Sequence, residues 1–218
     1  MTICQLRPDM IEALREQLVK ISQQAASMVK AIDTQSCLLC ETKNIKDLAL
    51  ELDSMTTYYH FQSSLLPHVE GLDEISKALS SLAEKRHGAL IAVERNDSLE
   101  AFIQKCKVAG VVIEARVTAS LLQTIFFPGN IMHDGAVIVR NGQIVTAGCV
   151  FPLSEQKVSK EGRKIGTRHR AALGLSEQCD ALVIVVSEET GRVSFALNGQ
   201  LFPIEVKLCE SLEQHQIN

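Results

Sequence analysis

A series of short apolar runs in the second part of the chain limits its possible folds more than any other feature of the sequence. Residues 88–93 and 181–186 consist of Val, Ile, Leu, Ala and one Gly, a composition typical of strands buried on both faces. Asn141-Gly142 and Asn198-Gly199 each separate two further runs, and this dipeptide is a strong signal of a tight hairpin. The runs predict a mixed β-sheet with strands at 88–93, 111–113, 136–139, 143–150, 181–186, 192–197 and 200–206.

Amphipathic segments between these runs predict helices that cover the sheet. Residues 72–82 carry leucine and isoleucine at helical spacing, as expected for a helix with one buried face. Thr118 is placed to cap a second helix that ends before Pro128-Gly129, and a third helix is expected over 168–178. We therefore expect an α/β fold with a mixed central β-sheet flanked by helices.

Two longer amphipathic segments precede this region. Residues 9–32 and 44–59 carry apolar side chains at steps of three and four residues and predict two helices. The polar stretch between them suits an antiparallel helical hairpin. The apolar stripe expected on the first helix consists of Ile11, Leu14, Leu18, Ile21, Ala25, Met28 and Ile32.

Pro67 and Gly71 interrupt the helical pattern, so we place a domain boundary near 62–70. A small N-terminal helical hairpin over 1–65 would then precede a larger domain over 66–218. The chain has 218 residues, of which 46% are hydrophobic, and a domain of this size can bury a substantial core.

The charge balance limits the possible partners. The net charge is −4 and the pI is about 5.9, so neither a general nucleic-acid surface nor a membrane surface is indicated. The sequence has no window with the ~18 apolar residues of a membrane span and no secretory signal peptide. We expect neither nucleic acid nor membrane as a partner.

The seven cysteines are scattered and odd in number, which does not suggest a disulfide framework and indicates a reducing, cytoplasmic location. Cys37-Leu38-Leu39-Cys40 is a lone CxxC motif. A zinc or redox site would need a second pair or a strand–helix context. We therefore predict that these two cysteines are small buried hydrophobic residues.

A possible cation site lies at the start of the run 136–139. His133 and Asp134 precede it, and a carboxylate there can bind Mg²⁺ or Mn²⁺ and orient a hydroxyl nucleophile. His133 as a second ligand would favour Mn²⁺. Gly135 and Ala136 have little side-chain bulk, so a ligand could approach the backbone closely. The alternative is a turn at Asp134-Gly135 with His133 on the surface.

A possible phosphate site lies at the start of the helix expected over 168–178. Gly166-Thr167-Arg168-His169-Arg170 places three potentially cationic side chains in a row, where they repel one another and oppose the helix dipole. A bound anion relieves both problems, and Arg, Thr and the first-turn N–H groups can all contact phosphate. The alternative is a solvated basic stretch.

A third polar cluster, Ser187-Glu188-Glu189-Thr190-Gly191, follows the run 181–186. Ligands often bind at strand ends in α/β sheets, so Ser187 is a candidate donor to phosphate and Glu188 a candidate partner of the metal or of the cationic cluster. Taken alone, this cluster is better explained as a hairpin turn with solvated acids. The cation and phosphate sites together predict a nucleotidyltransferase.

The three clusters resemble the diadenylate cyclase (DAC) family, which carries an Asp-Gly-Ala motif and an Arg-His-Arg motif. Asp134-Gly135-Ala136 and Arg168-His169-Arg170 match these motifs without departure, and the resemblance covers about 72–206. It implies a DAC-type fold and condensation of two ATP molecules into cyclic di-AMP with release of two pyrophosphates. The nucleotide-binding residues that it implies are Gly135, Ala136, Leu153, Gly166, Thr167, Arg168, His169, Arg170, Ser187 and Glu188.

The resemblance also implies individual roles. Asp134 would activate the 3′-hydroxyl and hold the metal with His133, and Glu188 would complete the metal shell. Arg168 and His169 would act with Asp134 as catalytic residues, whereas Arg170 would be more structural. The implied cofactor is Mn²⁺ or Mg²⁺, and the implied substrate is ATP.

Two 3′-hydroxyl groups must each attack the other ATP in line, and one domain carries only one set of motifs. The active unit would therefore be at least a twofold homodimer. The short helical N-terminal segment resembles the soluble, spore-type members of the family in bacilli, which implies a hexamer. We expect residues 1–65 to drive this assembly and to restrain activity by holding the cyclase faces partly out of register.

Two alternatives to an enzyme are a non-catalytic sensor module and a purely structural protein. A sensor module would hold ATP or a cyclic dinucleotide without turnover, but binding alone would not require Asp134 and His133 beside the phosphates. A purely structural, assembling protein would not require the intact motifs.

Overall fold

The computed structural model describes residues 6–33, 37–65, 72–158 and 164–204. The chain divides into two compact units, Met1–Ser63 and Ser64–Asn218. The expected boundary between 1–65 and 66–218 remains a prediction, since 66–71, with Pro67 and Gly71, lie outside the described residues. The end of the last expected strand, residues 205–206, also lies outside them.

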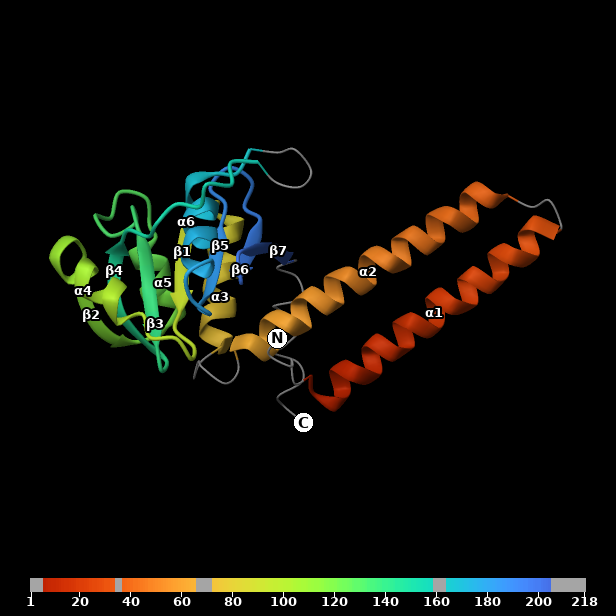
Figure 1. Ribbon diagram of the computed structural model, residues 1–218, viewed down its shortest axis with the longest axis horizontal. Helices are drawn as coiled ribbons and strands as arrows, with labels where there is room; N and C mark the ends of the chain where they lie inside the picture. The colour runs from red at the N-terminus through yellow and green to blue at the C-terminus, as the bar shows by residue number, and fades with distance from the viewer. Residues whose placement is uncertain (1–5, 34–36, 66–71, 159–163, 205–218) are drawn as a thin grey trace. The chain divides into compact units, whose positions relative to one another are not determined.

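The first unit is the expected helical hairpin. Its helices are α1 (Pro8–Asp33) and α2 (Leu38–Leu65), and Figure 1 shows them running antiparallel. The second helix is longer at both ends than the 44–59 expected from its apolar pattern. Gln17 Nε2 joins the two helices, because it donates to the Leu48 carbonyl oxygen at 3.1 Å and to Glu51 Oε2 at 2.9 Å.

The covered face of α1 differs from the stripe expected from the sequence. Ile11, Leu18 and Ile32 are exposed, whereas Gln17 is buried. The less exposed face consists of Met10, Leu14, Gln17, Ile21, Gln24, Met28 and Ala31. The apolar pattern does not show this face, because it includes two glutamines. Gln17 and Gln24 can lie there since their side-chain amides donate hydrogen bonds to Glu51 and Glu41 of α2. Apolar side chains of α1 are consequently left on its outer surface.

The second unit contains a seven-stranded sheet in the order β2-β4-β3-β1-β5-β6-β7. Strands β1 and β3 are parallel, and every other neighbouring pair in this order is antiparallel. The predicted mixed sheet is confirmed. Its strands are β1 (Ala89–Val93), β2 (Val111–Arg116), β3 (Ala136–Arg140), β4 (Gln143–Cys149), β5 (Leu182–Val186), β6 (Val193–Leu197) and β7 (Gln200–Ile204).

Both predicted hairpins are confirmed by their backbone. Asn141 and Gly142 have φ of 48° and 72°, and Asn198 and Gly199 have φ of 50° and 70°. Two consecutive positive φ values are the requirement of the tight turn that Asn-Gly favours. The Thr118 cap is also confirmed, because the Thr118 side chain accepts a hydrogen bond from Leu121 N at 3.2 Å.

Helices cover the sheet as expected, and Figure 1 shows them around it. Helix α6 packs on β5 and β6, and α4 packs on β4, over a core that includes Ile103, Ile138 and Val183. Helices α3 and α5 pack on each other, and α3 also contacts β5. The four helices are α3 (Leu72–Glu84), α4 (Glu100–Ala109), α5 (Ala119–Ile125) and α6 (Thr167–Ser176).

The cysteines depart from expectation in two ways. Cys106 and Cys149, 43 residues apart, are joined as a buried disulfide between α4 and the end of β4, a pairing that their spacing does not indicate. Cys37 and Cys40, predicted to be buried, are exposed. The reason is their position, since Cys37 directly precedes α2 and Cys40 lies in its first turn, where no layer of the sheet covers them.

Candidate active site

Three neighbouring strands place the sequence-predicted clusters at one end of the sheet. Ala89 of β1 pairs with Val186 of β5, and Ile91 pairs with Val137 of β3. Because β3 runs parallel to β1 and β5 antiparallel to it, the starts of β1 and β3 meet the end of β5. Gly88 and Ser187 lie directly beyond the ends of β1 and β5, and Asp134 lies two residues before β3. Neighbouring strands lie about 4.8 Å apart, so β3 and β5, on either side of β1, are about 10 Å apart.

A turn at Asn130 orients the predicted cation ligands. His133 N donates to the Asn130 carbonyl oxygen at 3.1 Å, and His133 Nδ1 lies 2.5 Å from the same oxygen. A carbonyl oxygen only accepts, so Nδ1 is assigned as the donor, and in the neutral tautomer Nε2 carries the lone pair. Nε2 lies 3.5 Å from Asp134 Oδ1, and the Asp134 side chain is 82% exposed. The turn therefore presents Nε2 of an imidazole and a carboxylate side by side.

Gly135 is required by the sheet. A Cβ at this position would lie 2.5 Å from the backbone carbon of Gly148 in β4, a separation that neither residue can tolerate. Ala136 next to it is fully buried. Close strand packing is therefore one reason for the glycine, and the approach of a ligand to these small residues stays a prediction.

The start of α6 faces the same end of the sheet. Gly166 is its N-cap and makes no side-chain capping bond, and Thr167 follows it exposed. Arg168 Nη1 lies 2.5 Å from Glu188 Oε2. This ion pair lies against Gly88, because a Cβ there would be 2.5 Å from Arg168 Nη1 and 3.1 Å from Glu188 Oε2. The phosphate cluster and the third polar cluster therefore meet at the start of β1.

The three potentially cationic residues of α6 have different surroundings. Burial lowers the pKa of His169, an effect that the negative charge of Glu189 partly opposes. The imidazole is therefore neutral at pH 7, where it can donate or accept one hydrogen bond. Arg170 turns to the protein, donating from Nε and Nη2 to the Ser154 carbonyl oxygen at 3.0 and 2.8 Å. Of these three residues, Arg168 alone keeps a charged side chain at the strand ends. This explains how three potentially cationic residues can follow one another in α6.

The segment after β5 is a hairpin turn between β5 and β6, as the simpler reading of the sequence had it. Gly191 N donates to the Ser187 carbonyl oxygen at 2.8 Å, and Ser187 Oγ accepts from Thr190 N at 3.3 Å. Glu188, however, is not merely solvated, since its carboxylate pairs with Arg168. Ser187 is half-buried at the base of the turn.

Leu153 lies on a segment that is tied to α6. Ser154 N donates to the Arg170 carbonyl oxygen at 2.9 Å, and Ser154 Oγ donates to Glu177 Oε1 at 2.6 Å. A Cβ on Gly174 would collide with the Pro152 carbonyl oxygen. The leucine side chain itself is 48% exposed. It is thus an apolar side chain held at the surface beside the helix.

The sequence pointed to most of these residues but gave no site role to Gly88, Ser154 or Glu177. A glycine directly before a buried strand was the available signal for Gly88. Ala171-Ala172-Leu173-Gly174 indicated only that α6 packs closely. Nothing in the sequence pattern links Ser154 to Glu177, which are brought together by the fold.

The predicted cation ligands are brought together only in part. His133 and Asp134 are adjacent, whereas Glu188 is engaged by Arg168. Within the described ranges, no group of three or more His, Cys, Asp or Glu side chains is arranged to hold a metal ion.

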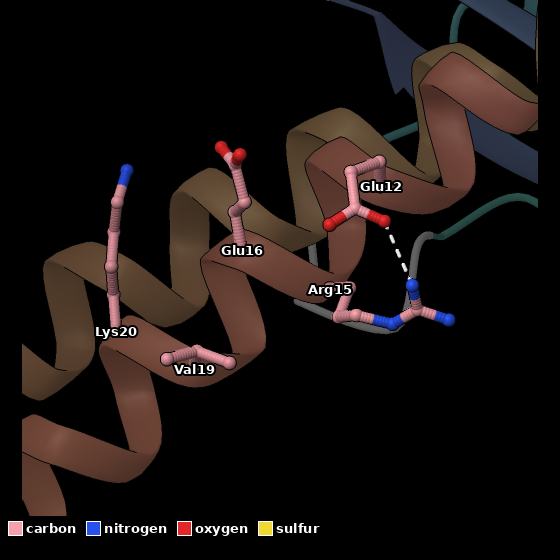
Figure 2. A pocket seen from close by; sticks show the side chains of 5 residues that line it. All are labelled: Glu12, Arg15, Glu16, Val19 and Lys20. Carbon is pink, nitrogen blue, oxygen red and sulfur yellow. Dashed lines mark hydrogen bonds and ion pairs between the residues drawn. The ribbon is translucent and has the colours of Figure 1, made fainter.

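A separate shallow pocket lies on the first unit. Figure 2 shows its lining, which comes from one face of α1 and includes the ion pair between Arg15 and Glu12 at 2.8 Å. The complete lining is Glu12, Arg15, Glu16, Val19 and Lys20. None of the predicted site residues takes part in it.

Comparison with known families matches residues 76–201 to the nucleotide-binding DAC family of the DisA bacterial checkpoint controller, and residues 1–68 to the N-terminal family of diadenylate cyclase CdaS. The first match covers more than half of the chain and includes all three polar clusters. The chain belongs to the diadenylate cyclase family. The resemblance found in the sequence motifs is confirmed.

Relatives of this diadenylate cyclase family member support the assignment over most of its length. It is 45% identical over 193 residues to diadenylate cyclase CdaS of Bacillus thuringiensis, covering 88% of this chain and 93% of that one. It is 42% identical over 188 residues to cyclic di-AMP synthase CdaS of Bacillus subtilis, covering 86% and 87%.

Two solved structures resemble the fold of this family member. A protein from Bacillus cereus, described as a hypothetical membrane-spanning protein, matches with a TM-score of 0.74 and 40% identity over 90% of this chain and 94% of that one. A double mutant of DacA from Staphylococcus aureus matches with a TM-score of 0.58 and 35% identity over 67% and 95%. Among the helices of the described residues, none has the length and apolarity needed to cross a membrane.

Proposed function

We propose that this protein condenses two ATP molecules into cyclic di-AMP and releases two pyrophosphates. The observation that carries the proposal is the convergence of two half-sites at one end of the sheet. One is the imidazole–carboxylate pair of His133 and Asp134, and the other is the start of α6 with Arg168. A nucleotidyl transfer needs a cation site and a polyphosphate site within one nucleotide length. The names of the relatives support the same reaction.

The triphosphate would bind at the start of α6. Gly166 leaves the first-turn N–H groups without a side-chain cap, so they are available to phosphate oxygens. Thr167 adds a hydroxyl, Arg168 a guanidinium and His169 a neutral imidazole donor. Ser187 lies next to this start across the sheet end, and the nucleoside would lie between the Gly135-Ala136 backbone and Leu153, with Arg170 holding the segment that carries the leucine.

The residues fit a divalent cation. A histidine whose Nδ1–H is fixed on a carbonyl oxygen, with its Nε2 beside a carboxylate, is the usual arrangement of a metal-ligating imidazole. His133 and Asp134 would hold Mg²⁺ or Mn²⁺, and Glu188 would join them once the triphosphate takes over Arg168. A cation held by these residues would neutralise phosphate charge and would make the 3′-hydroxyl more acidic. Phosphates and water would complete its shell.

The reaction would take place between two copies of the domain over residues 66–218. Each chain supplies a single Asp134 and a single Arg168, whereas the product contains two new phosphodiester bonds. A face-to-face pair in which each copy holds one ATP satisfies both attacks with twofold symmetry. The catalytic unit would therefore be at least a homodimer.

Residues 1–65 would organise these pairs into a larger assembly, a hexamer. The support comes from the apolar side chains that the hairpin leaves exposed, which include Ile11, Leu18, Val29, Ile32 and Leu50. Two helices alone bury little surface, and such side chains are covered when chains associate. The same segment would restrain activity by fixing the orientation of the cyclase faces. We place the assembly in the cytoplasm, with neither nucleic acid nor membrane as a partner.

The direct test is to incubate the purified protein with ATP and either Mg²⁺ or Mn²⁺ and to identify the nucleotide product by mass. Cyclic di-AMP with two equivalents of pyrophosphate is expected. The matched control is Asp134→Asn, which keeps the size of the side chain but removes its charge. A non-catalytic module that binds ATP or a cyclic dinucleotide would bind the nucleotide without forming product, and this outcome would overturn the proposal.

A further inference from the structure

The first turn of α2 carries two thiols in contact. Cys37 precedes the helix, and Cys40 lies three residues further on. Side chains three residues apart lie on the same side of a helical turn, and here the two Sγ atoms are 2.9 Å apart. Both cysteines are exposed. The sulfurs are about 0.9 Å farther apart than in a disulfide, where they are about 2.05 Å apart.

We propose that Cys37 and Cys40 form a reversible dithiol–disulfide couple whose substrates are low-molecular-weight disulfides, with Cys37 as the attacking thiol. The sulfur–sulfur contact and the exposure of both side chains carry this inference. Leu39, between the two cysteines, is 84% exposed, so a small disulfide has open access to the turn. The site is remote in sequence from every residue that serves the nucleotide reaction.

The surroundings assign different roles to the two thiols. A hydrogen bond from the Cys40 thiol, followed by the backbone N–H groups of Cys40 and Leu39, lowers the pKa of Cys37. The same sulfur contact raises the pKa of Cys40. The start of a helix also favours a thiolate through its free N–H groups. Cys37 is therefore the better nucleophile at neutral pH, and Cys40 is the thiol that closes the ring.

The exchange has two balanced steps. The Cys37 thiolate attacks one sulfur of the small disulfide, whose S–S bond breaks and releases one thiolate, leaving a mixed disulfide on Cys37. Cys40 gives its proton to solvent and attacks Sγ of Cys37, which forms the Cys37–Cys40 bond and releases the second small thiolate. The two cysteines lose two electrons and two protons, and one small disulfide becomes two small thiols.

The other described cysteines provide a contrast within the same chain. Cys179 is half-buried, and burial raises the pKa of its thiol. Cys106 and Cys149 are already paired with each other. Neither Cys179 nor the Cys106–Cys149 pair combines exposure with a second free thiol. We therefore expect exchange at Cys37 and Cys40 to be much faster than at these three cysteines.

The test uses the full chain and oxidised glutathione as the small disulfide. After timed exposure, free thiols are blocked with iodoacetamide, and the protein is digested with trypsin. Cleavage after Lys30 and Lys43 gives the peptide 31–43, which contains Cys37 and Cys40 and no other cysteine. We expect this peptide to appear unalkylated and lighter by two hydrogens than the dithiol form. The peptide 171–192, which contains only Cys179, should remain alkylated.

Two single variants assign the roles. Cys40→Ser should trap glutathione on Cys37 at a rate within a few-fold of the wild-type loss of dithiol. Cys37→Ser should react about tenfold or more slowly, because Cys40 lacks the backbone N–H bonds from Leu39 and Cys40 that favour a thiolate at Cys37. Treatment with dithiothreitol should restore the dithiol peptide in the wild type.

Several outcomes would overturn the inference. If peptide 31–43 remains doubly alkylated while Cys179 reacts, Cys37 and Cys40 are not the redox-active pair. A peptide cross-linked to another cysteine peptide, or to a second copy of itself, would show that the two thiols are not each other's partners. Equal rates for the two single variants would remove the assignment of Cys37 as the attacking thiol.

Discussion

Substitution of Gly88 by alanine should weaken ATP binding without unfolding the protein. A Cβ at this position would lie 2.5 Å from Arg168 Nη1 and 2.8 Å from Arg168 Cζ, whereas non-bonded atoms prefer about 3.5 Å or more. The guanidinium must therefore move by about 1 Å, which also disturbs its pairing with Glu188. Gly88 has no side chain that could contact ATP, so its substitution would change ATP binding by displacing Arg168.

The expected magnitude follows from the contact that Arg168 would make. A charge-assisted hydrogen bond to phosphate contributes about 1.5–3 kcal/mol, so its loss should raise the dissociation constant of ATP by about 10- to 150-fold. The unfolding free energy should change by less than about 1 kcal/mol, because the obstacle is the mobile end of a side chain and alanine lowers the entropy of the unfolded chain.

The assay is calorimetric titration with a non-hydrolysable ATP analogue and Mg²⁺, combined with urea unfolding. Gly174→Ala is the matched control, since its Cβ would meet the Pro152 backbone instead and should reduce stability. The decisive measurement repeats Gly88→Ala in an Arg168→Ala background, where it should have no further effect on affinity. An undiminished effect in that background, or unchanged affinity in the single variant, would refute the reasoning.

Further predictions concern four other features. Asp134→Asn should leave ATP binding intact and reduce product formation by at least about 100-fold, as expected for the loss of the charge that activates the hydroxyl; product within about threefold of wild type would contradict that role. The pKa of His169 is lowered in the folded state, so below about pH 6.5 the unfolded chain binds the proton more readily, and the unfolding free energy falls as pH decreases. His169→Gln should flatten that decline in urea titrations at pH 5–7. Arg170→Ala should lower the unfolding free energy by about 1–3 kcal/mol through loss of its two bonds to Ser154, with thermal unfolding as the measurement. Deletion of residues 1–65 should lower the mass measured by light scattering and raise specific activity; an unchanged mass would exclude the assembly role, and a fall in both would exclude the restraint.

The sequence predicted the sheet well because its signals are local. Runs such as 181–186 can be satisfied only by strands buried on both faces, and Asn141-Gly142 requires a backbone that other residues avoid. Helix α4 was not predicted, although Leu99, Ile103 and Cys106 lie at helical spacing and are buried together. The helix has only ten residues, so its apolar pattern covers fewer than three turns.

Residue type alone does not give the direction of a side chain. It placed Arg168 and Arg170 in one cationic cluster, and only the family resemblance implied a more structural role for Arg170. In the structure Arg168 faces Glu188, while Arg170 is turned to the Ser154 carbonyl oxygen. Which way a side chain points depends on neighbours that are distant in sequence. The same limit explains why the sequence could not show that Gly135 packs against the backbone of Gly148.

The pairing of β1 with both β3 and β5 also determines when during synthesis the site can exist. Ala89 cannot meet Val186 until β5 has left the ribosome, whereas the contact between Gln17 and Leu48 needs only the first two helices. Domains form as their last strands emerge. A chain terminated before β5 would thus carry the helices proposed for assembly but no complete site. Incorporated into mixed oligomers, it would occupy positions opposite intact partners and reduce activity by more than its share of the chains.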